Sequence, residues 1–438
     1  MRTLFQVSLF GFATVGAYAS DGRVLDGHVI DASTGKPIAE ATVTLGSKVV
    51  LTDGAGVYRI EGEGERIMAR APGYRASSYA AHSGGKAGGE LSLTPFVPRA
   101  LYLSIYGIGS KPIRDAALEV IHHGGANALV IDVKGDRGLL PYPSEIAMAK
   151  SNGARAVTTV RSLPDLVNNG HAQGIYMIAR IVTFKDDPLA KARPELAIKR
   201  ADGSPFRDNE GLGWTDPYQP EVRAYNVAIA VEAAKAGFDE VQFDYVRFPD
   251  SSMKMRFAGP TDEPGRVKAI SDFLRQAHAA LVPYNTFQAA DIFGYVSWNT
   301  NDTGIGQQLD EVVKIVDYLC PMLYPSGFKF GIPGHKNPMD SPYDIVRLTL
   351  DNAVRRTHAN PKKFRPWLQA FRDYAFGHQI FGPAQISGQT RAAADAGTDG
   401  WLLWNPHNNY RDLGLTGGAA AQTAVATSSA GKDVVAKN

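Results

Sequence analysis

Acidic and amide side chains alternate with apolar ones in the segment GFDEVQFDYVRFPD, which spans residues 237–250. Its polar positions are Glu240, Gln242 and Asp244. This alternation predicts a strand with one apolar face and one polar face. Asp244 is the polar residue nearest to the end of the strand, where a carboxylate can serve as a nucleophile or a general base. Glu240 and Gln242 lie deeper, and an ion pair that stabilises the fold is the simpler role for them.

Polar side chains also lie at the ends of other strand-like segments, and aromatic side chains lie close to them. Such a mixture suits a sugar, because hydroxyl groups need paired hydrogen bonds and the apolar face of a sugar ring packs on aromatic rings. We identify Asp244 and Asp291 as candidate catalytic residues. The candidate substrate-binding residues are Asp132, Lys134, Arg180, Trp214, Arg247, Tyr324, Gln369, Trp404 and Asn405. Taken singly, each aromatic residue could equally belong to the hydrophobic core.

Other chemistries lack their usual sequence signatures. None of the 10 histidines forms a His-x-His pair at the end of a strand-like segment, which a metal-dependent barrel hydrolase would need. The chain contains no Gly-x-Ser-x-Gly motif and no phosphate-binding P-loop. The short GIGS motif at residues 107–110 lacks the rest of a dinucleotide-binding fingerprint. We therefore predict no metal and no cofactor, and a pair of carboxylates as the catalytic groups.

Two carboxylates can hydrolyse a glycosidic bond between them. In this mechanism Asp244 is the nucleophile, and a cation such as Arg180 or Lys134 keeps it ionised. Asp291 is the best placed general acid and base. A structural carboxylate that caps the following segment is the alternative interpretation of Asp291. We favour a retaining mechanism.

The elements that must position these residues alternate between strand-like and helical patterns beyond residue 98, which favours βα units with parallel strands. Helices are expected at residues 111–125, 221–237 and 304–316, the second ending at Gly237, a residue suited to a left-handed cap. Eight strands with intervening helices predict a (β/α)₈ barrel, whose catalytic residues lie at the carboxyl ends of the strands. The predicted strands are residues 101–107, 128–135, 175–183, 239–248, 286–294, 317–325, 365–371 and 400–406.

Residues 20–97 consist of short apolar runs separated by Gly, Pro, Asp and Thr, which predicts a small all-β sandwich. The sequences GHVIDASTGKPIAEATVTL, TDGAGVYRI and APGYR resemble the carboxypeptidase regulatory-like domain. That resemblance implies a prealbumin-like fold with a structural or adhesive role and no catalytic residues. We expect residues 98–416 to form the barrel, and each of the two domains to have its own core.

The ends of the chain and its composition indicate where the protein acts. Residues 1–19 combine Arg2, an apolar run and the sequence Ala17-Tyr18-Ala19, which is typical of a secretory signal peptide. An uncleaved membrane anchor is the alternative; no other segment could span a membrane. The net charge is only +2 and dense basic runs are absent, so nucleic acid is not an expected partner. We expect export to the periplasm or the extracellular space, and a disordered tail at residues 417–438.

The segment GWTDPYQPEVRAYNVAIAVEAAKAGFDEVQFDYVRFP, together with NALVIDVKGDRG, IARIVTFKDDPLA, RPWLQAF and GWLLWNP, resembles the putative glycosyl hydrolase domain family of bacterial proteins. The resemblance covers residues 101–410 and implies a glycosidase-like barrel. More distantly, the placement of Asp244 is similar to that of the nucleophile in the α-amylase and α-galactosidase barrels. One departure is Ala370 in the seventh strand, where the resemblance implies an acidic residue.

These observations favour an exported glycoside hydrolase that acts on a polysaccharide or oligosaccharide. A barrel that binds carbohydrate without cleaving it is the main alternative, since the same residues could hold a glycan. An adhesion or scaffolding protein led by the sandwich explains less, because it leaves the polar strand ends without a role.

Overall fold

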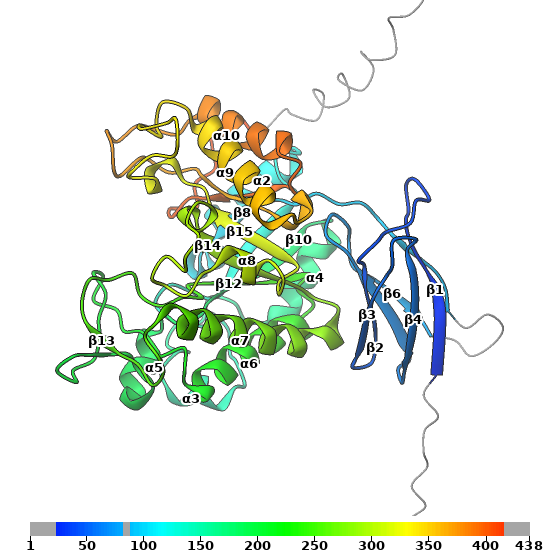
Figure 1. The fold of residues 1–438 in the computed structure, drawn as a ribbon, viewed down its shortest axis with the longest axis horizontal. Coiled ribbons are helices and arrows are strands. Elements are labelled where there is room, and N and C mark those ends of the chain that lie inside the picture. Colours follow the sequence, from blue (N-terminus) through cyan, green and yellow to red (C-terminus); the bar gives the residue numbers. More distant parts are fainter. Residues whose placement is uncertain (1–22, 82–87, 416–438) are drawn as a thin grey trace, which may run out of the picture.

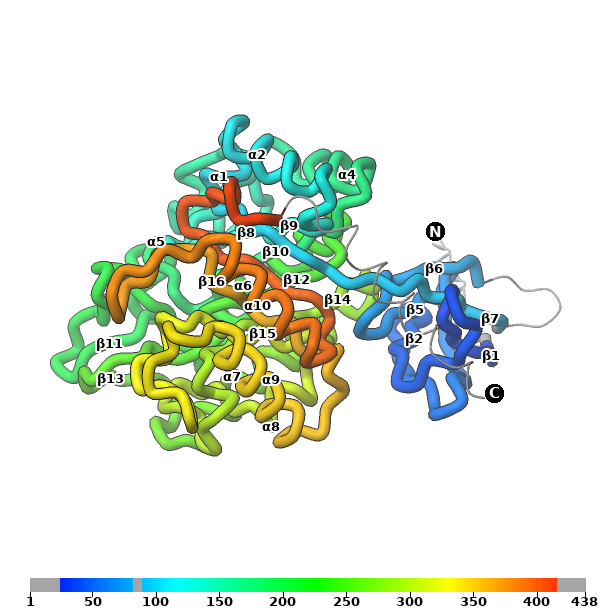
Figure 2. Tube along the Cα trace, turned by 90° about the horizontal axis from the view of Figure 1, so that it is seen from above, coloured from blue at the N-terminus to red at the C-terminus, as the bar shows by residue number. Residues whose placement is uncertain are grey.

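The structure is a computed structural model that describes residues 23–81 and 88–415 (Figure 1). The predicted signal peptide and the predicted C-terminal tail lie outside these residues. Figures 1 and 2 both show a small β-sandwich beside a larger barrel. In the described part of the chain, no helix is both long enough and apolar enough to cross a membrane.

The sandwich consists of one three-stranded and one four-stranded sheet that enclose a separate hydrophobic core. Leu25, Val43 and Ile60 are buried in this core. The three-stranded sheet is formed by β1 (Arg23–Asp31), β4 (Val57–Gly62) and β7 (Gly88–Leu93). The other sheet is formed by β2 (Thr42–Leu45), β3 (Lys48–Leu51), β5 (Arg66–Arg70) and β6 (Ser77–Ala80). The prediction of an all-β sandwich is therefore confirmed.

Eight parallel strands form a closed barrel, as predicted, because β17 pairs with β8 and completes the ring. Aliphatic and aromatic side chains such as Val130, Ile178 and Tyr318 fill its interior. The strands in chain order are β8 (Arg99–Leu103), β9 (Ala128–Lys134), β10 (Tyr176–Val182), β12 (Glu240–Asp244), β14 (Phe287–Phe293), β15 (Tyr318–Met322), β16 (Trp367–Gln369) and β17 (Trp401–Trp404).

Helices cover the outside of the barrel (Figure 1). The longer ones are α2 (Lys111–His122), α4 (Leu163–Ala172), α6 (Pro220–Lys235), α7 (Glu263–Leu281), α9 (Pro342–Thr357) and α10 (Pro383–Asp395). Helix α6 ends as predicted, because Gly237 follows it with a φ of +98°. Its Val222, Tyr225 and Ile229 are buried on one stripe.

The helix predicted at residues 304–316 is wrong in extent, since only α8 (Leu309–Val312) forms there. Gly304 and Gly306 adopt positive φ angles, and their backbone N–H groups donate to the carboxylate of Asp302. This loop precludes a helical start before residue 307.

The sandwich packs on the amino-terminal end of the barrel strands. Arg70 of β5 contacts Asp317, which precedes β15, with an Nε to Oδ2 distance of 3.5 Å. Asn285, which precedes β14, donates to two carbonyl oxygens of the sandwich, and the hydroxyl of Tyr318 accepts the backbone N–H of Gly73 at 3.2 Å. These contacts leave the opposite end of the barrel, where the strands terminate, away from the sandwich.

Candidate active site

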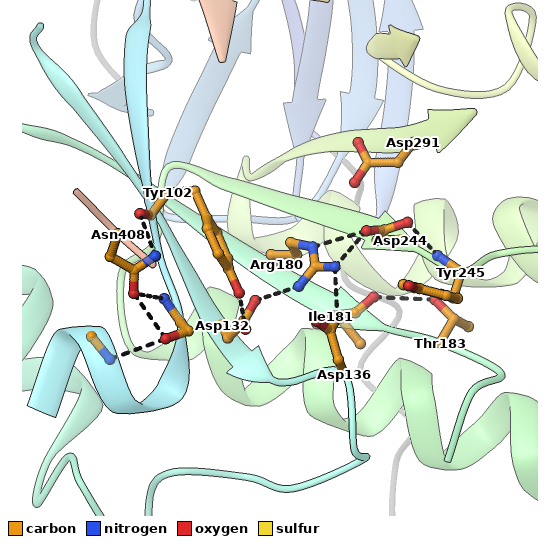
Figure 3. Close-up of polar contacts among 12 residues, drawn as sticks. Tyr102, Asp132, Asp136, Arg180, Ile181, Thr183, Asp244, Tyr245, Asp291 and Asn408 are labelled. Atoms are coloured by element: carbon orange, nitrogen blue, oxygen red, sulfur yellow. Dashed lines mark hydrogen bonds and ion pairs between the residues drawn. The ribbon is translucent and has the colours of Figure 1, made fainter. Parts of the chain in front are cut away.

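The guanidinium of Arg180 joins three carboxylates at the carboxyl end of the barrel strands (Figure 3). Nη1 donates to Asp132 at 2.6 Å, and Nη2 donates to Asp136 at 2.9 Å. Nε and Nη2 both donate to Oδ2 of Asp244, at 3.0 and 2.5 Å. Arg180 is 1% exposed, so these charge-assisted bonds are little weakened by water. They hold the carboxylate of Asp244 in one orientation.

Strand register brings this cluster together. Arg180 of β10 lies opposite Asp132 of β9, and Val182 of β10 lies opposite Asp244 of β12. Arg180 and Val182 share a face because side chains alternate along a strand. Val241 and Phe243 form the predicted apolar face of the strand and belong to the core outside the barrel wall. Consequently the polar face of β12 points into the barrel.

Glu240 and Gln242 form the deeper part of that polar face. Glu240 accepts a hydrogen bond from Arg365 at 2.6 Å, and both side chains are completely buried. The predicted interior ion pair is therefore present. Gln242 donates to Asp291, so it links the fourth strand of the barrel to the fifth.

Tyr245 follows β12 directly and leaves the regular strand geometry, although its side chain packs against the same outer core as Val241 and Phe243. Its φ is +48°, which is unusual for an aromatic residue and is typical of functional sites where the surroundings maintain the strain. Its backbone N–H donates to Oδ1 of Asp244 at 2.6 Å, and its ring lies 5.7 Å from that of Trp214. With Oδ1 bonded to this N–H and Oδ2 to Arg180, the side chain of Asp244 keeps 10% exposure at the mouth.

Asp291, near the end of β14, lies in a different environment. Its Oδ1 accepts hydrogen bonds from Gln242 at 2.7 Å and from the indole of Trp367 at 2.8 Å. Its Oδ2 is buried and has no partner among the described residues. Burial raises the pKa of Asp291 well above its ordinary value, and the charge of Asp244 raises it further. Asp291 therefore favours its protonated form.

Asp132 is a third perturbed carboxylate. Burial raises its pKa to about 7, although Arg180 acts in the opposite direction. The hydroxyl of Tyr102 donates to Asp132 at 2.7 Å, and the ring of Tyr102 stacks on Trp404 at 4.0 Å. Trp404 also lies under the guanidinium of Arg180, which is 4.8 Å from the centre of its ring. These contacts place Trp404 within the cluster.

The sequence interpretation missed two members of this cluster, Tyr102 and Asp136. Tyr102 lies near the end of the first barrel strand, and Asp136 follows the second strand in the turn Gly135-Asp136-Arg137-Gly138. Their positions directly at strand ends were the available signal. Asp136 is the most accessible carboxylate of the cluster, with 40% of its side chain exposed.

Lys134 does not contact Asp244, so its suggested role beside that carboxylate is wrong. Its ammonium pairs with Asp186 at 2.7 Å and donates to Asn226 of α6 at 2.9 Å. The physical reason is a register shift in the pairing of β9 with β10 after Arg180. An irregularity of this kind changes which face the following residue occupies, and Lys134 points toward α6.

Gln369 and Asn405 are near the mouth but use their polar groups within the protein. Gln369 exchanges two hydrogen bonds with Ser326, at 3.0 and 2.7 Å. Asn405 donates to the carbonyl oxygens of Ala370 and Asn409. Both residues therefore support loops. Ala370 is buried and brings no carboxylate to the site.

The remaining predicted residues form an aromatic side of the mouth. Trp214 is buried and donates its indole N–H to Asp208 at 2.9 Å. Arg247 lies over the rings of Trp214 and Phe293, 5.0 and 4.4 Å from their centres. Tyr324 lines an apolar cavity of about 260 Å³, together with Phe293, Gly294, Tyr295, Met322, Gly327, Phe328 and Tyr374.

A closed parallel barrel with clustered carboxylates at the carboxyl ends of its strands is the architecture of TIM-barrel enzymes. Sequence comparison assigns the family: residues 100–410 match the putative glycosyl hydrolase domain, and the chain belongs to that family. The resemblance predicted from the sequence is confirmed. No curated protein matches the chain.

Solved structures include several with similar barrels. A hypothetical protein from Ruminiclostridium thermocellum ATCC 27405 is 35% identical, with a TM-score of 0.38; the alignment covers 44% of this chain and 96% of that one. The PgaB (BpsB) glycoside hydrolase domain from Bordetella bronchiseptica is 16% identical, with a TM-score of 0.52. The alignment covers 73% of this chain and 97% of that domain. The similarity to the Bordetella bronchiseptica domain supports the barrel fold.

Proposed function

We propose that this protein hydrolyses glycosidic bonds in a polysaccharide or oligosaccharide, with Asp244 as nucleophile and Asp291 as general acid and base. The observation that supports this proposal best is the contrast between the two carboxyl groups. Asp244 is bonded to a buried guanidinium, whereas Asp291 has no cationic partner among the described residues and a raised pKa. Environments that push two neighbouring carboxyl groups toward opposite protonation states are typical of acid and base pairs.

In the proposed reaction, Asp244 attacks the anomeric carbon while the glycosidic bond breaks. Asp291 transfers its proton to the departing oxygen, and a water molecule later releases the sugar from Asp244 with Asp291 as the base. Arg180 holds the attacking carboxylate in place. We favour retention of configuration, in which Asp244 forms a covalent bond to the sugar and Asp291 acts first as the acid and then as the base.

The signal-peptide pattern of residues 1–19 supports action outside the cytoplasm, and the sandwich resembles a carboxypeptidase regulatory-like domain. A barrel that binds glycans without cleaving them is the second candidate function. It is favoured by the complete burial of Asp291 and by Ala370 in place of an acidic residue.

The test compares Asp244→Asn, Asp291→Asn and wild type on glycosides with activated and ordinary leaving groups. Asp250→Asn is the matched control, because Asp250 is an exposed carboxylate just beyond the same strand. The Asp244 variant should lose several powers of ten in rate, each equivalent to ~1.4 kcal/mol. The Asp291 variant should lose less with an activated leaving group, which needs little protonation.

Melting temperatures should show that both variants fold. Wild-type rates in the Asp244 variant would exclude it as the nucleophile. Proton NMR of the first product gives its configuration, and an inverted product would exclude the retaining route. Binding of glycans by the wild type without any cleavage would establish the second candidate function.

A further inference from the structure

The buried cationic side chains of this protein are paired with carboxylates, with one exception. Buried lysines and arginines of the described residues are Arg70, Lys134, Arg180, Lys185, Arg247 and Arg365. Five of them lie within 4.0 Å of at least one carboxylate oxygen. Arg247 has no such ion pair among the described residues, although only 8% of it is exposed. Buried charges without partners are costly and are retained mainly where they are used.

Arg247 lies three residues after Asp244, at the mouth of the candidate active site. Its guanidinium is held by the aromatic rings of Trp214, Tyr245 and Phe293, at 5.0, 5.2 and 4.4 Å from their centres. Nη1 donates to the backbone carbonyl of Phe248 at 3.0 Å. Nε and Nη2 have no hydrogen-bond partner within the described structure, yet neither is completely covered by protein.

The neighbouring cation Lys185 differs in this respect. It also lies over the ring of Tyr245, at 5.0 Å, but its ammonium is bonded to Glu210 at 2.8 Å. Lys185 is therefore neutralised within the protein. Arg247 instead keeps one edge of its planar guanidinium, Nε and Nη2, without a hydrogen-bond partner in the described structure.

We propose that Arg247 binds an anionic group of the substrate, a carboxylate or a sulfate, so that the glycan bound in this site is acidic. The inference rests on the proposed function in so far as it takes the ligand to be a carbohydrate. A guanidinium edge matches two oxygens of such an anion and forms paired charge-assisted hydrogen bonds. The three aromatic rings around the guanidinium reduce the access of water to these bonds, which strengthens them.

The position of Arg247 also places the anion relative to the sugar. Phe293 contacts Arg247 and lines the apolar cavity that contains Tyr324. A sugar ring packed on these aromatic residues can therefore direct an acidic substituent to the guanidinium. Neutral glycans would leave Arg247 buried without a counter-ion, which supplies selectivity against them.

The experiment measures binding by calorimetry, with the Asp244→Asn variant of the full chain so that no ligand is consumed. The probes are uronate-containing oligosaccharides with their carboxyl-reduced neutral twins, and sulfated oligosaccharides with their desulfated twins. We expect at least one acidic probe to bind about tenfold or more tightly than its neutral twin, a difference of ~1.4 kcal/mol. The pair that shows the preference identifies the anion as carboxylate or sulfate.

When Arg247→Gln is introduced into the Asp244→Asn variant, it should abolish the preference for the acidic probe over its neutral twin. Arg247→Lys in the same variant should retain part of this preference, because it keeps the positive charge. Arg137→Gln is the control for the general field of the site, because Arg137 is an exposed arginine in the turn after β9. It should keep the preference. Arg247→Gln also removes the contacts of the guanidinium with three aromatic rings, so thermal unfolding should be used to show that this variant is still folded at the temperature of the binding experiment.

The outcomes separate this inference from the proposed function. Equal binding of every acidic probe and its twin, or no binding of acidic probes, overturns the inference even if wild type cleaves neutral glycans. Equal losses in the Arg137 and Arg247 variants also overturn it, because they indicate only a general electrostatic effect. A preference that depends on Arg247 supports it, even if wild type cleaves no glycan and the proposed hydrolysis fails.

Discussion

Asp244 ends β12 and Asp291 lies near the end of the neighbouring β14, but their surroundings act on a negative charge in opposite ways. Arg180 compensates the charge of Asp244, and the N–H of Tyr245 occupies its second oxygen. Asp291 receives two neutral donors on one oxygen and, among the described residues, none on the other. The chemical difference between the two groups thus comes from their hydrogen-bond partners and burial, not from residue type.

Asp132 allows this electrostatic description to be tested without a substrate. Its folded pKa of about 7 exceeds the ordinary value of about 4, so the folded protein holds a proton in this range that the unfolded chain has released. The contribution of this proton to the free energy of unfolding is fully present below pH ~4 and is lost as the pH rises through ~7. Between these values the free energy of unfolding falls by at most about 1.4 kcal/mol per pH unit. Urea unfolding should show a weaker decline with pH in Asp132→Asn than in wild type.

The comparison between the two proteins matters because other carboxylates also titrate in this range. Their effects cancel in the difference between wild type and Asp132→Asn. Parallel stability curves over the whole range would mean that Asp132 is ionised in the folded protein at all these pH values.

Among the elements, the ends of the strands determine which side chains reach the mouth. The positive φ at Tyr245 and the irregularity after Arg180 both interrupt a regular alternation. One turns an aromatic ring toward Trp214, and the other directs Lys134 to Asp186. Local departures from regular geometry therefore decide the membership of the site.

The junction of α6 and β12 provides a prediction about such a local geometry. Gly237→Ala should reduce the free energy of unfolding by about 1–2 kcal/mol, because a φ of +98° is unfavourable for a residue with a Cβ atom. A methyl group at this position would lie 3.5 Å from its nearest neighbour, a side-chain carbon of Val167, so steric contact adds little. Denaturant unfolding measures this loss. An unchanged midpoint would show that the loop relaxes to a negative φ at no cost.

The regular elements could be predicted from sequence, whereas much of the site could not. All eight barrel strands follow from apolar runs between helical patterns. Arg180 lies beside Asp244, as expected for a cation at the end of a barrel strand. The direction of Lys134 could not be predicted, because a strand irregularity leaves no trace in residue types. Gln369 has the composition of a binding residue, yet its partner Ser326 comes from another loop. Such long-range partners depend on tertiary packing.

The whole molecule consists of two cores joined at the amino-terminal end of the barrel. Phe96 belongs to the connection between them, and its ring lies 5.3 Å from that of Tyr176 in the barrel interior. Arg75 of the sandwich side covers Phe96, with its guanidinium carbon 3.9 Å from the ring centre. The barrel therefore depends on a residue that precedes its first strand.

Two truncated chains should measure how much Phe96 contributes to the stability of the barrel. A chain that begins at Thr94 keeps Phe96, and a chain that begins at Pro98 loses it. Both should fold, since the barrel has its own core, but the shorter chain should be less stable by about 1 kcal/mol, less than the value of a fully buried aromatic side chain because Phe96 is only partly buried. Urea unfolding followed by tryptophan fluorescence measures the difference. Failure of both chains to fold would mean that the sandwich is required for the barrel core.

The attachment of the sandwich also gives the molecule a defined direction. Arg70, Gly73 and Asn285 join the sandwich to one end of the barrel, and Asp244 opens at the other. A molecule immobilised through its sandwich on a bead or a sensor surface would hold its mouth outward, whereas attachment through the rim of the barrel would obstruct it. Attachment through the sandwich would therefore orient a whole layer of these molecules with their candidate active sites facing the surrounding solution.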